Sequence, residues 1–169
     1  MQHVFQPMDL DFVEINPFTK IGNDWFLVTA GDETKVNTMT AGWGGFGVIW
    51  AKKVVYIFIR KSRYTKEFID KHDTFSISFM DKSQHAALKY LGQVSGRNED
   101  KIAGARLNID FYEGTPYIDE SSEVYICRKL SATELTPDQF IDPEIKDKFY
   151  GDNDLHIMYV GEITQFMAR

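Results

Sequence analysis

The segment 54–59 most constrains the fold, because all six of its residues are β-branched or aromatic. Such a run is typical of a central, fully buried strand, and it is far too short to span a membrane. A second segment, 74–79, alternates strictly, so that Phe75, Ile77 and Phe79 share one face. The two patterns together predict a β-rich fold with a buried sheet face.

Other segments add strands and a few helices to this prediction. Strand–helix alternation is too sparse for a doubly wound parallel sheet, so the predicted fold class is mainly β, a β-barrel with a few helices. No repeat, low-complexity tract or linker divides the 169 residues, and we expect a single domain over 1–169. Further strands are expected at 25–30, 36–40, 121–129 and 155–166, and helices at 63–71 with Ser62 as the N-cap, at 83–91 closed by Gly92, and as turns within 137–149.

Charge and composition exclude several classes of protein. The formal charge is −6, from 19 Lys and Arg against 25 Asp and Glu, which argues against nucleic acid or an anionic membrane as the partner of the whole surface. The first residues have neither a basic start nor an apolar stretch, so we expect no signal peptide and a cytoplasmic location.

Cys127 is the single cysteine, so it cannot form an internal disulfide, and we expect it to be buried. The four scattered histidines have no metal-ligand spacing, so no metal site is predicted.

Residues 42–47 read G-W-G-G-F-G and match the G-x-G-x-x-G pattern of dinucleotide-binding folds. That site requires a helix directly after the glycines, because the helix amides hold the pyrophosphate. The downstream segment 48–55 is β-branched and runs into the expected strand. We therefore interpret the glycines as a bend where the backbone can approach a flat ligand or another chain.

The segment 51–66 is basic within an acidic chain: it has six basic residues and no acidic one. Its C-terminal part lies where the buried strand should end and a helix begin, which offers free amides and the positive end of a helix dipole. Guanidinium and hydroxyl donors at such a junction indicate a phosphate site, and a solvated basic face is the alternative. The compensating acidic residues are expected elsewhere, in 110–123 and 134–154. The basic residues are Lys52, Lys53, Arg60, Lys61, Arg63 and Lys66.

No nucleophile elbow, Ser-His-Asp arrangement or P-loop is present. A phosphate site combined with many aromatic residues and little acid–base machinery is typical of a protein whose bound cofactor carries the chemistry.

Three motifs resemble the flavin reductase-like, FMN-binding split-barrel family, especially its flavoredoxin-like branch. They are N-T-M-T-A-G-W-G-G at 37–45, R-x-S-R-Y-T-x-E-F-I at 60–69, and S-G-R at 95–97 followed by Lys101. The resemblance extends over most of the chain, from about residue 23 to about residue 166. It implies a split β-barrel that forms a homodimer, with FMN bound near the subunit interface.

The resemblance also implies which residues hold FMN. Residues 37–41 should contact the isoalloxazine ring with Trp43 nearby, residues 60–65 should hold the phosphate, and a second loop should bring Ser95 and Lys101 to the flavin. It implies no catalytic residue, and His156 either lies close to the site or is a satisfied histidine of the barrel. The implied FMN-binding set is Asn37, Thr38, Met39, Thr40, Ala41, Trp43, Arg60, Ser62, Arg63, Tyr64, Thr65, Ser95, Lys101 and Phe166.

The activity implied by the resemblance is that of an NAD(P)H:flavin oxidoreductase. Reducing equivalents would pass from NAD(P)H through bound FMN to free flavin or to a redox protein partner. Two alternatives remain open: a flavoredoxin-like electron carrier with little NAD(P)H turnover, and a split barrel that has lost the cofactor and serves as a binding module. No nucleic-acid or membrane partner is expected.

Overall fold

The computed structural model describes residues 4–169. The strands are β1 (Gln6–Met8), β2 (Phe26–Gly31), β3 (Val36–Ala41), β4 (Gly44–Ile49), β5 (Lys52–Arg60), β6 (Thr74–Phe79), β7 (Ile109–Tyr112), β8 (Thr115–Ile118), β9 (Glu123–Glu134) and β10 (His156–Ala168). The helices are η1 (Leu10–Phe12), α1 (Pro17–Thr19), η2 (Lys20–Asp24), α2 (Tyr64–Lys71), η3 (Lys82–Gln84), α3 (His85–Gln93), α4 (Lys101–Gly104), η4 (Pro137–Gln139) and α5 (Pro143–Phe149).

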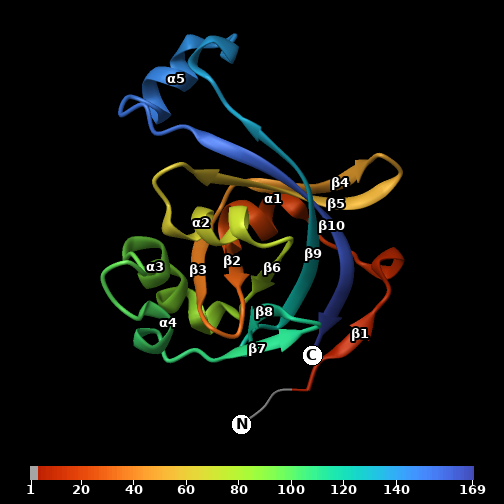
Figure 1. Ribbon diagram of the computed structural model, residues 1–169. Coiled ribbons are helices and arrows are strands. Elements are labelled where there is room, and N and C mark those ends of the chain that lie inside the picture. The colour runs from red at the N-terminus through yellow and green to blue at the C-terminus, as the bar shows by residue number, and fades with distance from the viewer. Residues whose placement is uncertain (1–3) are drawn as a thin grey trace.

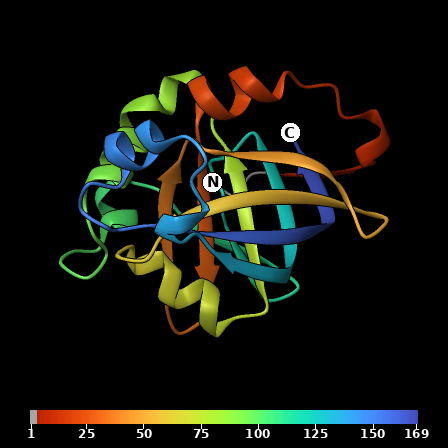
Figure 2. The same cartoon turned by 90° about the horizontal axis from the view of Figure 1, so that it is seen from above.

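One antiparallel sheet of eight strands forms most of the structure, in the order β3-β2-β6-β9-β10-β5-β4, with β1 paired to β10. It curves into a barrel that carries its helices on the outside, and β7 and β8 form a separate hairpin (Figures 1 and 2). The prediction of a mainly β fold, a β-barrel with a few helices, is therefore confirmed.

The barrel interior is built from alternating strand residues, as the two sequence patterns predicted. Val55, Ile57 and Ile59 of β5 and the inward residues of β6 belong to one buried cluster. Tyr56 and Phe58 lie on the opposite face of β5 and are only partly buried. The expectation that 54–59 is fully buried is thus wrong for Tyr56 and Phe58, because the outer face of the barrel is incompletely covered there, although Val54 is buried.

The glycine-rich segment is a strand and not a bend. β4 pairs with β5 in a hairpin, with Gly45 opposite Tyr56. A Cβ atom on Gly44 would lie 2.6 Å from the carbonyl oxygen of Tyr56, so the glycine permits a close approach to the neighbouring strand. No helix follows β4, which is the reason the dinucleotide fingerprint does not apply.

Two predicted helix ends are also corrected. Ser62 is not the N-cap of α2: the cap residue is Arg63, and the Ser62 hydroxyl donates to Asp154 instead. Gly92 lies inside α3 and does not end it; the C-cap residue is Val94. At Ser62, the contact with Asp154 engages the hydroxyl that was expected to cap the helix.

Residues 135–155 leave the barrel between β9 and β10 and form a projection, here called the lobe, which contains η4 and α5 (Figure 1). Arg60 attaches the lobe to the end of β5, because its guanidinium donates to the carbonyl oxygens of Asp154 at 2.8 Å and Phe149 at 3.1 Å.

Cys127 is buried in the barrel, as predicted. Within residues 4–169, no helix has the length and apolar character needed to cross a membrane.

Candidate functional site

Two adjoining clefts lie where β3, β5 and β10 approach the lobe. The first cleft, of about 210 Å³, receives side chains from the end of β3, from the outer face of β5 and from the start of β10. Its lining combines apolar and aromatic side chains with two arginines and a histidine. The lining residues are Met39, Thr40, Ala41, Gly42, Trp43, Phe58, Arg60, Arg63 and His156.

The second cleft, of about 240 Å³, lies around the start of α2 and is polar. It shares Met39, Arg60 and Arg63 with the first cleft, so the two adjoin along these side chains. Its remaining residues come from β3, α2, the loop after α3, α4 and the lobe. They are Asn37, Ser62, Tyr64, Thr65, Gln93, Val94, Ser95, Lys101 and Asp154.

Arg63 stands apart from the other cations of the basic segment. Each of the other five makes an ion pair with a carboxylate, and two of these carboxylates, Glu134 and Asp152, come from the acidic segment 134–154. Within residues 4–169, Arg63 makes no ion pair, and its guanidinium donates only to the carbonyl oxygen of Gly92 at 3.2 Å. The ion pairs are Lys52–Glu162, Lys53–Asp11, Arg60–Asp152, Lys61–Glu134 and Lys66–Asp70.

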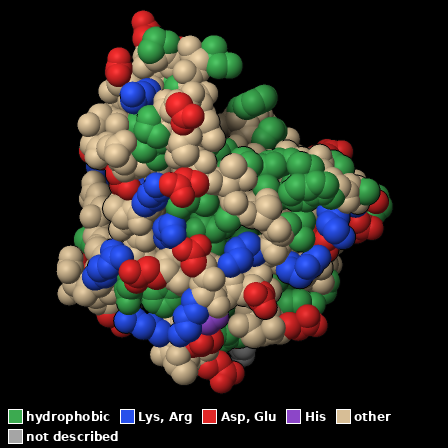
Figure 3. All heavy atoms as spheres, turned by 45° about the horizontal axis from the view of Figure 1, so that its top comes forward, with side chains coloured by type: hydrophobic (Ala, Val, Ile, Leu, Met, Phe, Trp, Pro, Cys, Tyr) green, Lys and Arg blue, Asp and Glu red, His purple; other side chains and the backbone are tan. Residues whose placement is uncertain are grey.

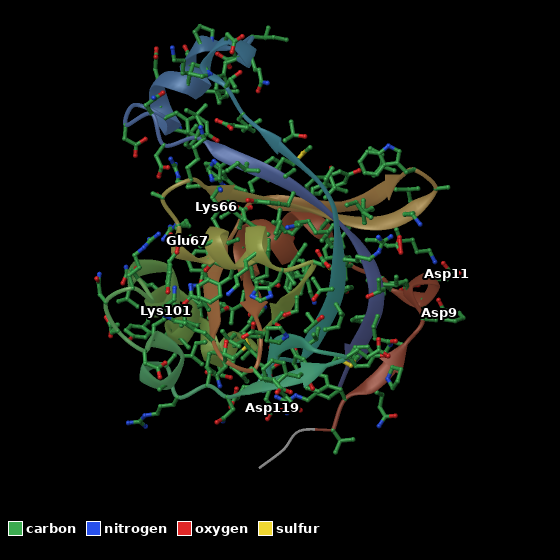
Figure 4. The ribbon with its side chains drawn as sticks, in the orientation of Figure 1. Asp9, Asp11, Lys66, Glu67, Lys101 and Asp119 are labelled. Carbon is green, nitrogen blue, oxygen red and sulfur yellow. The ribbon has the colours of Figure 1, made fainter. Side chains whose placement is uncertain are left out.

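Lys101 is a second cation without an ion pair in the described part of the chain. Its side chain is nearly buried, at 4 % exposed, and its ammonium donates to the carbonyl oxygens of Leu91 at 3.0 Å and Val94 at 3.2 Å. It lies on the same side of the barrel as the part of α2 marked by Glu67 (Figure 4). Burial, together with the charge of Arg63, lowers the pKa of Lys101 to about 8.

His156 lines the first cleft and is 7 % exposed. Its Nδ1 atom lies 2.6 Å from the hydroxyl of Tyr150, and its ring lies 5.2 Å from that of Trp43. Burial, assisted by the charge of Arg60, lowers the pKa of His156 to about 4, so the imidazole is neutral near pH 7. The first cleft thus contains a neutral imidazole together with Arg60 and Arg63, and of the two clefts Lys101 lines only the second.

Two residues of the FMN-binding set lie outside both clefts. The Thr38 hydroxyl donates to the carbonyl oxygen of Val28 at 3.1 Å, and its side chain is buried. Phe166 is buried near the far end of β10, where its ring stacks on Tyr125 with centroids 4.4 Å apart. Both side chains belong to the barrel core of this chain. The other members of the set line one or both clefts.

The structure brings Ser95 and Lys101 together. Both line the second cleft with Arg63, beside the predicted phosphate residues, and neither lines the cleft of Trp43.

The residues expected from the sequence do not include Phe58 and Asp154, which line the clefts, or Arg97, which lines neither cleft but contacts two of their residues. Phe58 lies two residues before Arg60 on the same face of β5, so strand alternation contained a signal for it. Arg97 donates to the carbonyl oxygen of Ser62 at 3.2 Å, and its guanidinium carbon lies 4.7 Å from the Tyr64 ring centroid. Asp154 reaches Ser62 across 92 positions of sequence, and no local pattern could have indicated that contact.

A family model described as "Flavin reductase like domain" matches residues 18–169. The chain belongs to the flavin reductase-like family. No curated protein matches the chain. The sequence resemblance to this family is thereby confirmed over nearly the whole chain.

Three solved structures illustrate the fold of this flavin reductase-like chain. An FMN-binding domain of a flavin reductases-like enzyme from Shewanella baltica has a TM-score of 0.70 at 15% identity, over 99% of this chain and 78% of that chain. Flavoredoxin from Methanosarcina acetivorans has a TM-score of 0.67 at 23% identity, covering 93% and 75% respectively. An NADH:FAD oxidoreductase from Streptomyces globisporus has a TM-score of 0.65 at 18% identity, covering 86% and 75%. These likenesses establish that the flavin reductase-like chain has the split-barrel fold.

Proposed function

We propose that this flavin reductase-like protein binds FMN, with the phosphate in the second cleft and the isoalloxazine ring in the first. The observation that carries the proposal is the pair Arg63 and Lys101. Two cations without ion pairs in the described part of the chain, one of them nearly buried, line the second cleft, which adjoins the first cleft along Arg63. Such an arrangement is unfavourable until an anion lies beside both cations, and a phosphate supplies that charge.

The donors of the second cleft suit a phosphate group. Arg63 and Lys101 would provide charge, while Ser95 and the amides at the start of α2 would provide neutral donors. Thr65 has a buried hydroxyl that already accepts a hydrogen bond from the amide of Asn37 at 2.8 Å, and it can still donate one.

The walls of the first cleft suit a planar ring. Met39, Phe58 and Trp43 offer apolar surface, and neutral His156 offers a polar edge without a charge. FMN, when bound, supplies hydride and electron transfer; the protein's side chains position the ring and limit its contact with water.

The proposed activity is that of an oxidoreductase that takes reducing equivalents from NAD(P)H and delivers them to free flavin or to a redox protein. The similarity to an NADH:FAD oxidoreductase supports this direction. The purified protein should have a flavin absorbance spectrum, or acquire one on titration with FMN, and should bleach when NAD(P)H is added without oxygen. A colourless protein that ignores added FMN would refute the proposal.

A second candidate is an FMN electron carrier with little NAD(P)H turnover. The similarity to a flavoredoxin favours it. The same experiment separates the two candidates, because a carrier would bleach with dithionite or a protein donor and stay oxidised with NAD(P)H.

We further propose that the protein is a homodimer. Figure 3 shows hydrophobic side chains gathered between the lobe and the β4–β5 hairpin. Trp43 at the mouth of the first cleft is 46 % exposed, and Val48 and Trp50 on the hairpin are exposed as well. A second copy would cover such a surface. Light scattering should give twice the monomer mass, and Val48→Glu should shift the protein towards the monomer.

A further inference from the structure

The carboxylate of Asp154 holds two donors that suit a bound phosphate. Its Oδ1 atom accepts a hydrogen bond from the backbone amide of Ser62 at 3.1 Å, and its Oδ2 atom accepts one from the Ser62 hydroxyl at 2.5 Å. Ser62 lies just before α2, between the two arginines of the second cleft. An amide and a hydroxyl at the start of a helix are donors that phosphates use in proteins. The Asp154 carboxylate therefore occupies the hydrogen-bond donors of Ser62 that a bound phosphate would use.

The main chain around Asp154 is held independently of this contact. Arg60 donates to the carbonyl oxygen of Asp154 at 2.8 Å, and the amide of Lys61 donates to the carbonyl oxygen of Leu155 at 3.1 Å. Leu155 is itself buried. The Asp154 side chain can therefore leave Ser62 by rotating about its own bonds, while the lobe stays attached to the end of β5.

We propose that Asp154 competes with the ligand's phosphate for Ser62, so that a phosphate monoester binds in the second cleft by displacing this carboxylate. The inference rests on the proposed function for the identity of the ligand as FMN. A carboxylate and a phosphate cannot share the same donors, because both are negative and would repel each other at contact distance. Asp154 then lowers the affinity for a phosphorylated ligand while leaving its unphosphorylated form unaffected, which makes it a specificity-determining residue.

The alternative is that Asp154 only ties the lobe to Ser62. Asp154→Asn distinguishes the two roles, because the asparagine keeps the size of the side chain and one acceptor oxygen while it removes the charge. Asp147→Asn is the matched control: Asp147 lies exposed on α5, in the same lobe, and its loss changes the net charge equally. Thermal unfolding of both variants would show that each still folds.

The first experiment uses inorganic phosphate and follows the amide resonance of Ser62 by NMR. Asp154→Asn should bind phosphate about tenfold more tightly than the wild type, since one repulsive charge is removed at contact distance. The Ser62 resonance should move on binding, and Asp147→Asn should behave as the wild type does. Equal phosphate affinity in the wild type and Asp154→Asn, or no binding to either, would overturn the inference.

The second experiment compares FMN with riboflavin, which lacks the phosphate. Asp154→Asn should bind FMN about tenfold more tightly and riboflavin with unchanged affinity, because only the phosphate meets the carboxylate. Equal tightening for both flavins would overturn the inference. If the phosphate experiment succeeds and no variant binds either flavin, the proposed function fails and the competition at Ser62 stands.

Discussion

Lys101 shares the second cleft with Arg63, and the charge of Arg63 adds to burial in lowering the pKa of the lysine to about 8. Neither cation makes an ion pair in the described part of the chain, although five neighbouring cations do. An anion bound beside Lys101 would favour its charged form and raise its pKa again. Ligand binding and the protonation of Lys101 are therefore linked.

This linkage predicts that FMN affinity weakens as the pH rises through about 8. Below that pH the free protein already carries the charge on Lys101, so binding requires no proton. Above it, binding must take up a proton, and the dissociation constant should rise by up to about tenfold per pH unit. Titrations followed by flavin fluorescence across this range would measure the slope. Lys101→Met should bind more weakly and lack that slope; an identical slope in both proteins would contradict the prediction.

The second prediction concerns Arg63. Arg63→Ala should weaken FMN binding by about 2–3 kcal/mol, because its guanidinium is a charge-assisted donor without a competing carboxylate. The matched control is Lys61→Ala, which removes an exposed cation already paired with Glu134. That variant should bind FMN nearly as the wild type does. Equal losses in the two variants would show that general charge, and not position, determines the affinity.

The third prediction follows from the close contact between Gly96 and Asn37. A Cβ atom on Gly96 would lie 2.2 Å from Oδ1 of Asn37, whose amide nitrogen donates to Thr65 in the second cleft. Gly96→Ala should therefore displace the loop or the asparagine, with a loss of about 1–3 kcal/mol in unfolding free energy and weaker FMN binding. Gly22→Ala is the control, because its added Cβ would meet no atom within 4 Å apart from its chain neighbours and its own helix. Chemical denaturation of both variants tests this.

The barrel strands could be predicted from the sequence because each strand's residue pattern lies within a single short segment. In β6, the alternation of Phe75, Ile77 and Phe79 indicates both the strand and its buried face. The prediction of a bend at 42–47 was wrong for a physical reason. Glycines in a single segment are typical of a bend, whereas here they let strand β4 lie against Tyr56 of the neighbouring strand. This role of the glycines depends on the neighbouring strand β5, so the sequence of the glycine-rich segment alone does not reveal it.

The site was predictable in part for the same reason. Arg63 and Thr65 follow a buried strand directly, so their place beside a helix start could be inferred from neighbouring residues. The partners of the basic segment could not, since Glu134 at the end of β9 and Asp154 in the lobe approach it only through the tertiary fold. The family motif places Thr38 in β3 beside the residues that line the clefts, but it does not reveal that the hydroxyl faces Val28 in the core.

The last prediction concerns the acid side of the stability profile. His156 is buried beside Tyr150, and burial holds its pKa near 4, below the usual value of about 6.5. Above pH 6.5 the histidine is neutral in both the folded and the unfolded state, so its contribution is constant. Between about 6.5 and 4 the unfolded chain takes up a proton that the folded protein resists, so stability falls as the pH falls, by about 2–3 kcal/mol in total from this group.

Urea denaturation at several pH values would measure that loss, and His156→Gln should reduce it because glutamine does not titrate. The matched control is His85→Gln, since His85 is an exposed histidine that lies outside both clefts. It should keep the wild-type slope. An equal slope in the wild type and His156→Gln would mean that the acid-sensitive group is another one, and that the imidazole in the first cleft is not held neutral by its burial.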